Sequence, residues 1–279
     1  MASFADISEY INRATGGNSG SPQFLTKWMP GRVAGAAATA LIAGRPASLW
    51  TYDSTRGGAG AVPTTVAIPD NTTNGGLLQT DATGGRELWL TFAGAWANVS
   101  GRLVIYDRLL HIGSLSGTVT TAQTVGGTLT RNTTGVGNQI WAEIYTIIGV
   151  TGTTITASYT DQDNNAAQTT IATGFGATNF REVSRIIPMP LASGDTGVRA
   201  VASTTVLATT GTAGNFGITV ARPLMSIPLV ATGSGGNAGA IAKAMPPVKI
   251  DVDACIALAF FPNAVTVPEL WAEIFCCER

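Results

Sequence analysis

The chain contains little of the chemistry that most enzymes use. Charged residues make up 12% of its 279 residues, whereas an ordinary soluble domain carries about 25%. There is one histidine, His111, and there are only three lysines. Proton transfer and nucleophilic attack at neutral pH draw mainly on His, Lys, Cys and paired carboxylates. This scarcity favours a protein that packs against other proteins, and we expect no catalytic residue, no cofactor and no metal.

Long apolar runs, basic patches and a secretory leader are also missing. No segment is an uninterrupted apolar run of the about 18 residues that a membrane-spanning helix needs. The formal net charge of −1 provides no general attraction for nucleic acid. The first residues, Met1 to Asp6, contain neither the basic nor the apolar region of a signal peptide. We therefore expect no membrane and no nucleic-acid partner.

Cysteine is rare and is placed late in the chain. Cys255, Cys276 and Cys277 are an odd number of cysteines, which does not indicate a disulfide framework. No C-x-x-C pair occurs, and the one histidine is distant in sequence, so a zinc site is not expected. All three cysteines can stay reduced in a cytoplasm. Alternatively, Cys276 or Cys277 forms a crosslink to another subunit, because chain ends can reach a neighbour.

The N-terminus has the pattern of a short amphipathic helix. Ser3 can cap a helix that extends to Ala14, and a run rich in Gly and Ser at residues 15–22 ends it. A helix this short is not stable alone in water, so we expect it to anchor the chain on other subunits. The apolar residues on its one face are Phe4, Ile7, Tyr10 and Ile11.

The segment that follows is punctuated by Ala, Gly and Pro. From residue 23 to residue 69 only isolated large side chains occur, among them Trp28 and Trp50. We interpret this segment as irregular and wrapped over a neighbour, with both tryptophans as interface anchors. Together with the helix it makes a predicted N-terminal arm of residues 1–86.

From about residue 87 onward the pattern is that of short strands. Thr, Val, Ile and aromatic residues alternate between turns of Gly, Asn and Asp. No helical pattern separates them, so residues 87–279 are predicted to form an all-β, antiparallel sandwich or jelly roll. The expected strands are 88–92, 101–107, 115–125, 139–146, 153–160, 168–172, 182–188, 197–207, 215–220, 255–261 and 270–275.

Two loops imitate ligand-binding motifs. Residues 161–165 resemble the start of a calcium loop, but Ala166 and Ala172 stand where that loop needs Gly and a bidentate Glu. We interpret this loop as a hairpin tip. Residues 233–238 fit G-x-G-x-x-A, but the next element is short and Pro246 ends it, which favours a surface loop over a dinucleotide site.

Two further arrangements could in principle support hydrolysis. His111 is the one imidazole that a Ser-His-Asp triad could use, but no G-x-S-x-G segment presents a serine. It is placed at a predicted strand end. Glu143 and Glu273 each lie two residues after a tryptophan and could form a glycosidase pair. Polar residues on the open faces of two strands explain both glutamates equally well.

Segments in the middle of the chain resemble a group of tailed-phage virion proteins. The resemblance spans about residues 100–230, and it implies a structural role in the virion without enzymatic activity. It is carried by LVIYDRLLHIG (103–113), LSGTVTTAQT (115–124), FRE (180–182), IPMPL (187–191) and GTAGNFGITVARPL (211–224).

The composition and this resemblance predict a virion protein that is made in the host cytoplasm. The expected role is that of a capsid decoration or cement protein, a homo-oligomer and specifically a trimer, bound to the major capsid protein through many repeated contacts. One alternative is a tail or fibre-associated module that binds a host glycan, which needs clustered exposed aromatics. Another is a glycan depolymerase, which needs two carboxylates about 5–10 Å apart.

Overall fold

The computed structural model describes residues 22–29, 41–52, 58–178, 180–230, 238–265 and 269–278. Within these ranges the chain forms fifteen strands and no helix, and the paired strands are antiparallel. The predicted all-β, antiparallel class is confirmed. No helix in the described ranges is long and apolar enough to cross a membrane. The helix expected at residues 3–14 lies outside the described residues.

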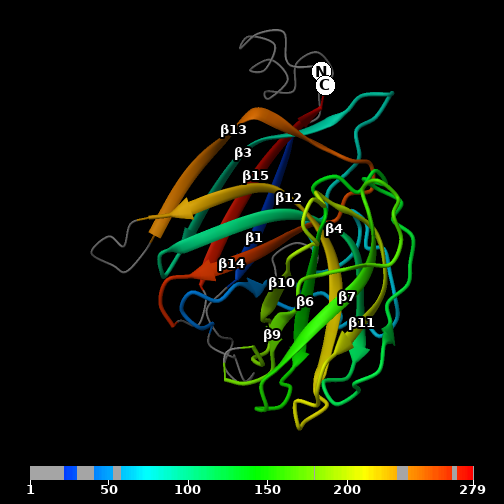
Figure 1. Ribbon diagram of the computed structural model, residues 1–279. Helices are drawn as coiled ribbons and strands as arrows, with labels where there is room; N and C mark the ends of the chain where they lie inside the picture. Colours follow the sequence, from blue (N-terminus) through cyan, green and yellow to red (C-terminus); the bar gives the residue numbers. More distant parts are fainter. Residues whose placement is uncertain are drawn as a thin grey trace.

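The strands form three sheets (Figure 1). The four-stranded sheet has the order β1 (Gln23–Met29), β15 (Leu270–Glu278), β3 (Leu88–Ala97), β13 (Ala238–Ile250). The six-stranded sheet has the order β10 (Ile186–Met189), β6 (Gln139–Thr146), β12 (Asn215–Leu229), β4 (Gly101–Leu115), β14 (Ile256–Pro262), β2 (Ala47–Ser48). The five-stranded sheet contains β5 (Gln123–Thr124), β11 (Val198–Val206), β7 (Thr153–Asp161) and β8 (Gln168–Thr169), and β9 (Thr173–Phe175) also pairs with β7.

The long strands β4 and β12, of 15 residues each, connect the two ends of the molecule. Figure 1 shows β12 rising through the lower part and then turning toward the four-stranded sheet. Two irregularities in its pairing with β4, at Val220/Ala221 and at Pro223/Met225, lie in the middle of this path. A β-bulge bends a strand and increases its twist. The two bulges therefore let one pair of strands serve two separate cores.

Each half of β4 and β12 packs in a different hydrophobic core. Leu103 and Ile105 join a cluster that includes the inward residues of the four-stranded sheet, such as Leu90. Leu110 and Ile112 join a second cluster with the five-stranded sheet, such as Val201. Since side chains alternate along a strand, the residues between them face the other side, where they form a smaller third cluster. Its members include Trp50, Val104, Tyr106, Trp141 and Ala257.

Several strand expectations need correction. Residues 23–29 were expected to be irregular, but they form β1, which pairs with β15 along its whole length. The element at residues 240–245 was expected to be short and to end at Pro246, but it belongs to β13, an edge strand that continues to Ile250. An edge strand tolerates proline because one side needs no ladder bonds, and the register shifts between Lys243 and Val248.

The described part of the predicted arm contributes to the β domain. Leu41, Leu49 and Leu77 precede the boundary predicted near residue 87, but they lie in the same hydrophobic cluster as Leu88. Residues 58–69 stay largely irregular, as expected. The described part of residues 1–86 therefore shares a core with the residues that follow it.

Candidate functional site

The most concentrated chemistry in the described residues is a buried ion network centred on Arg108. The Arg108 side chain is fully buried, and its Nη2 atom lies 2.7 Å from Glu143 Oε2. It donates further hydrogen bonds to Tyr145 Oη at 2.8 Å, to Tyr106 Oη at 3.2 Å and, from Nε, to His111 Nδ1 at 2.9 Å. Glu143 also accepts bonds from Tyr145 and Thr219. A buried charge is tolerated when its partners are this complete.

A bulge in the pairing of β4 explains how Arg108 and His111 meet. Residues three apart in a regular strand point to opposite faces. Arg108 pairs with Ala221 and Leu110 with Val220, so one extra residue of β4 is inserted between them. The insertion brings Arg108 and His111 to the same face. Both contact Trp50, whose ring centroid lies 4.4 Å from Arg108 Cζ and 5.1 Å from the His111 ring.

The network fixes the protonation states of its members. Burial and the Arg108 guanidinium lower the pKa of His111 from 6.5 to about 2, so its Nδ1 stays an acceptor. Burial raises the pKa of Tyr106 to about 12 and the pKa of Tyr145 well above its ordinary value. Against the desolvation that burial imposes, Glu143 keeps the pKa of Arg108 well above its usual range. An imidazole with so low a pKa is a poor general base near neutral pH.

A second buried ion pair lies next to the first in sequence. Asp107 accepts two bonds from Arg131, at 3.0 and 3.2 Å, and one from the backbone N–H of Cys255 at 2.9 Å. Arg131 also donates to the carbonyl oxygens of Pro69 and Arg108. These bonds attach the irregular segment before β3 to the middle of β4. The pairs therefore brace the junction between the two cores.

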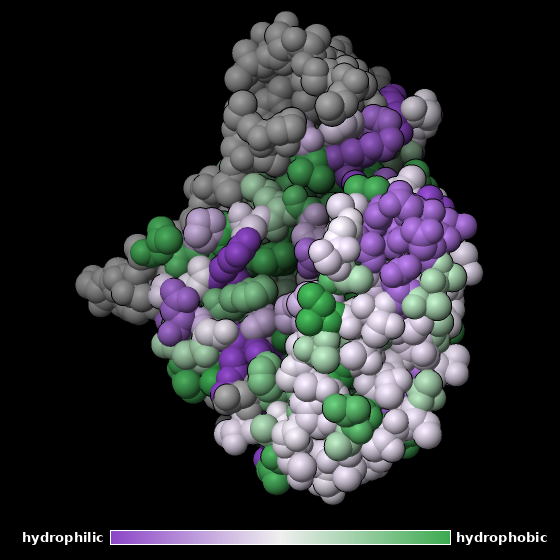
Figure 2. All heavy atoms as spheres, viewed as in Figure 1, coloured by the Kyte–Doolittle hydropathy of each residue, from purple (hydrophilic) through white to green (hydrophobic). Residues whose placement is uncertain are grey.

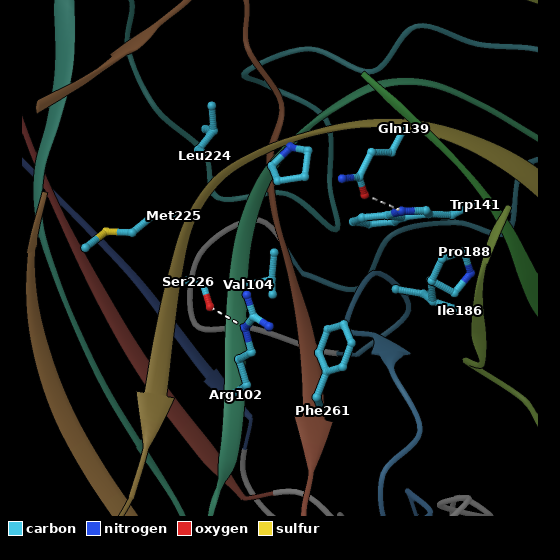
Figure 3. Close-up of a pocket in the computed structure, with 11 residues that line it drawn as sticks. Arg102, Val104, Gln139, Trp141, Ile186, Pro188, Leu224, Met225, Ser226 and Phe261 are labelled. Atoms are coloured by element: carbon cyan, nitrogen blue, oxygen red, sulfur yellow. Dashed lines mark hydrogen bonds between the residues drawn. The ribbon is translucent and has the colours of Figure 1, made fainter. Parts of the chain in front are cut away.

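A shallow hollow of about 340 Å³ lies on the outer face of the six-stranded sheet (Figure 3). Trp141 donates to Gln139 Oε1 at 3.0 Å on one side of it, and Arg102 contacts Ser226 on the other. The Trp141 side chain is only 5% exposed, so the hollow offers little aromatic surface for stacking. The remaining lining residues are Val104, Ile186, Pro188, Pro223, Leu224, Met225 and Phe261.

The outer face of the four-stranded sheet has a different character. In the strand register, Trp271 stands opposite Trp96, and Phe275 stands opposite Phe92. Directly opposite residues share one face of a sheet. The two aromatic rows are four residues apart along β15, which is about 13 Å.

Between the two rows lies a polar position. Glu273 occupies it, stands opposite Gly94 and accepts a bond from Trp271 Nε1 at 2.9 Å. Trp271 is 37% exposed, Trp96 and Phe92 are half-buried, and Phe275 is buried. We call Phe92, Trp96, Trp271, Glu273 and Phe275 the aromatic face. Sequence spacing could not reveal it, because its rows come from strands that are distant in the chain.

The predicted interface residues have different outcomes. Phe4, Ile7, Tyr10 and Ile11 lie outside the described residues. Trp28 occupies a β1 position opposite Trp271, and its side chain is outside what the structure describes. Trp50 is 1% exposed and donates to the Ala61 carbonyl oxygen. The expectation that Trp50 anchors an interface is therefore corrected, because Trp50 covers Arg108 inside the protein.

The structure also shows where the two predicted pairs lie, the thiols Cys276 and Cys277 and the carboxylates Glu143 and Glu273. Cys276 and Cys277 are both 0% exposed in β15, so a crosslink to another subunit, which stays a prediction, needs β15 to open. Burial raises the pKa of Cys255 to about 12. Glu143 and Glu273 lie on different sheets, Glu143 being buried against Arg108 and Glu273 exposed.

The loop at residues 161–165 is a hairpin tip, as predicted. Tyr159 pairs with Gln168, which joins β7 to β8. The Asp161 carboxylate accepts bonds from the backbone N–H groups of Asp163 and Asn165. Both carboxylate oxygens of Asp161 are thus used within the turn. Across the described ranges, no three His, Cys, Asp or Glu side chains gather as a metal site would require.

Comparisons with known proteins give no family. No family model matches the chain, and no curated protein matches it. Among solved structures, VP2 of infectious bursal disease virus in a subviral particle is 8% identical, with a TM-score of 0.22 over 92% of this chain and 80% of that one. VP17, a capsid protein of bacteriophage P23-77, is 11% identical, with a TM-score of 0.20 over 93% and 97% of the two chains. Superpositions at this level do not establish a common fold.

Proposed function

We propose that the protein is a non-enzymatic structural component of a virus particle, and specifically a capsid decoration or cement protein that binds the major capsid protein. The observation that carries the proposal is the aromatic face of the four-stranded sheet. Trp and Phe are enriched at subunit interfaces, where they contribute much of the binding energy. The resemblance of residues 100–230 to tailed-phage virion proteins supports the same role.

The Arg108 network supports a mechanical role as well. Its ionisable groups face each other rather than a substrate, since Arg108 and Glu143 are both buried. They lie where the long strands pass from one core to the other. Removing one partner of such a pair is strongly destabilising, so the network holds the junction in one geometry. A shell component needs this rigidity to add strength to the shell.

The proposed assembly is a homo-oligomer, which we propose to be a trimer located in the virion. Repetition lets individually weak contacts with the shell act together. Light scattering on the recombinant chain, at several concentrations and with shell subunits added, measures this directly. The proposal requires a trimer that binds shells, and a monomer that does not bind shells contradicts it.

The direct test of the function is occupancy of purified particles. We expect quantitative mass spectrometry to find hundreds of copies per particle. Trp271→Ala is expected to reduce that number at least about fivefold, as for an interface hot spot. Val136→Ala, at another exposed apolar position (56% exposed), should leave it unchanged. Only a few copies, or full occupancy by the Trp271→Ala variant, would contradict the proposal.

A second candidate, a glycan-binding module on a tail or fibre, is favoured by one observation. Glu273 places a carboxylate beside the partly exposed ring of Trp271. Sugars present C–H groups that pack on aromatic faces and hydroxyls that donate to carboxylates. Glycan binding by the recombinant chain that is lost in both Trp271→Ala and Glu273→Gln, together with a copy number of only tens, would support this candidate. If the chain binds no glycan and occupies the particle in high copy number, the glycan-binding candidate is excluded and the decoration role is retained.

A further inference from the structure

Three loops at one end of the described part of the molecule contain no charged residue. The loops that meet there are residues 116–122 after β4, residues 147–152 between β6 and β7, and residues 207–214 between β11 and β12. The longer stretches that contain them, residues 112–130, 144–160 and 200–221, include no Asp, Glu, Lys, Arg or His. Figure 2 shows this lower end of the molecule in white and green, while the strongly hydrophilic colour gathers elsewhere. We call the three loops the uncharged tip.

The uncharged tip exposes apolar side chains. Leu207 is 75% exposed, Val150 is 65% exposed and Ile147 is 44% exposed, and Val119 is 39% exposed. Soluble surfaces usually intersperse such residues with charges of both signs. Here many of the neighbours are Thr, Gly and Ala, whose short side chains have little conformational entropy to lose on binding.

The three loops are also held firmly together. Gly117 N–H donates to the Ala213 carbonyl oxygen at 2.8 Å, and Thr210 N–H donates back to Gly117 at 2.9 Å. Gly149 N–H donates to Thr212 and Thr151 N–H donates to Thr210, at 3.2 and 3.0 Å. The buried Thr210 side chain lies between the loops. A surface that is ordered before it binds loses less entropy on binding.

We propose that the uncharged tip is the contact between copies of this chain, which meet tip to tip around a symmetry axis. In a contact around a symmetry axis, the residues nearest the axis lie near their own copies, so a charge there would face a like charge. A tip without charge avoids that repulsion, and it needs no pairs of opposite charges to offset it. A different partner would more commonly be oriented by charge complementarity, which the tip does not offer. This proposal deepens the proposed function, because it names the surface that makes the homo-oligomer.

The test introduces a single charge at the tip. We expect the full-length chain to be an oligomer in light scattering, and both Val150→Lys and Leu207→Lys to weaken self-association at least about tenfold by repulsion between copies. Val252→Lys is the matched control, because Val252 also lies in an exposed turn and is 66% exposed. It should associate like the unmodified chain. Thermal unfolding checks that all three variants fold.

The outcomes separate this inference from the proposed function. If both tip variants fold and keep the unmodified oligomer, or if the unmodified chain stays monomeric at every concentration, the tip is not the contact between copies. Loss of association in Val252→Lys as well as in the tip variants would likewise overturn the assignment. A tip-dependent oligomer that is missing from purified particles would instead contradict the proposed function and leave this inference standing.

Discussion

Among replacements of a single charged residue, we expect replacement of Arg108 to lower the free energy of unfolding the most. Arg108→Met removes the partner of a buried carboxylate, Glu143, and we expect a loss of about 3–5 kcal/mol in the free energy of unfolding. Arg222→Met is the control: Arg222 pairs with Asp251 at 2.9 Å, but both side chains are nearly a third exposed. That loss should stay below about 1 kcal/mol. Urea unfolding measures both, and equal losses would contradict the account of the network.

His111 should make stability depend on pH. Its pKa is lowered from 6.5 to about 2 in the folded chain, so the unfolded chain binds the proton first as pH falls. The contribution of neutral His111 to the free energy of unfolding is complete above about pH 6.5 and is lost progressively below that pH. Between pH 7 and pH 5 we expect a loss of about 2 kcal/mol from this residue.

The His111→Gln variant isolates this contribution. The amide oxygen of Gln can accept the Arg108 bond but does not titrate. Urea unfolding at pH 7, 6 and 5 should show a shallower pH dependence in the variant than in the unmodified chain. The raised pKa of Asp107 acts with the opposite sign in both proteins, so it cancels in the comparison. Identical slopes would show that His111 is not held neutral.

Individual residues show why sequence spacing could not assign the site. Trp50 fits an interface anchor by its isolation, but it covers Arg108 because residues 41–52 pack into the domain. His111 was expected at a strand end and lies inside β4. Its contact with Arg108 depends on a bulge, and nothing in the local sequence marks where the extra residue is inserted.

The uncharged tip provides a prediction at the scale of elements. A methyl group added at Gly149 would lie 1.7 Å from the Thr210 carbonyl oxygen, whereas one at Gly152 would meet only the Ala177 Cβ atom at 3.3 Å. Gly149→Ala must therefore push two loops apart and should cost about 1–3 kcal/mol. Gly152→Ala should change stability by no more than about 0.5 kcal/mol. Chemical denaturation tests this, and equal stabilities would contradict the close loop contact.

The predicted arm provides a second prediction at this scale. Deleting residues 1–22, which precede β1, should leave the thermal unfolding of the β domain unchanged and reduce the copy number on particles. Two double substitutions test whether the apolar face of the predicted helix is responsible for the anchoring. Replacing Phe4 and Ile7 by Ser should reduce occupancy, while replacing Asp6 and Glu9 by Ser should not. Full occupancy after the deletion would show that the arm is not an anchor.

Strands with regular alternation were the most predictable elements. The expected 139–146 is β6, and the expected 153–160 is β7 within one residue. Residues 115–125 were also expected to form a strand, but after Leu115, which ends β4, only the two-residue β5 forms there. The Gln123 side chain accepts from the Ser116 N–H and donates to the Ser116 carbonyl, at 2.8 and 3.0 Å. A side chain thus takes the place of ladder bonds in this loop, which alternation cannot reveal.

At the scale of the whole molecule, the fold joins two cores through one pair of long strands. The all-β class followed from composition and spacing, but the division into two cores did not, because it depends on bulges in the middle of the β4–β12 pair. The surfaces are divided in the same way. The aromatic face belongs to the four-stranded sheet, and the uncharged tip lies at the ends of β4, β6 and β11 and at the starts of β7 and β12. We therefore expect shell binding and self-association to be separable functions.

An electron-microscopy reconstruction of the intact particle tests this account most directly. The account predicts density for the double-core fold at many equivalent positions on the shell, with the aromatic face of the four-stranded sheet against the major capsid protein and the uncharged tips of several copies meeting at a symmetry axis. Density confined to the tail, or a shell whose outer surface carries no such fold, would contradict it.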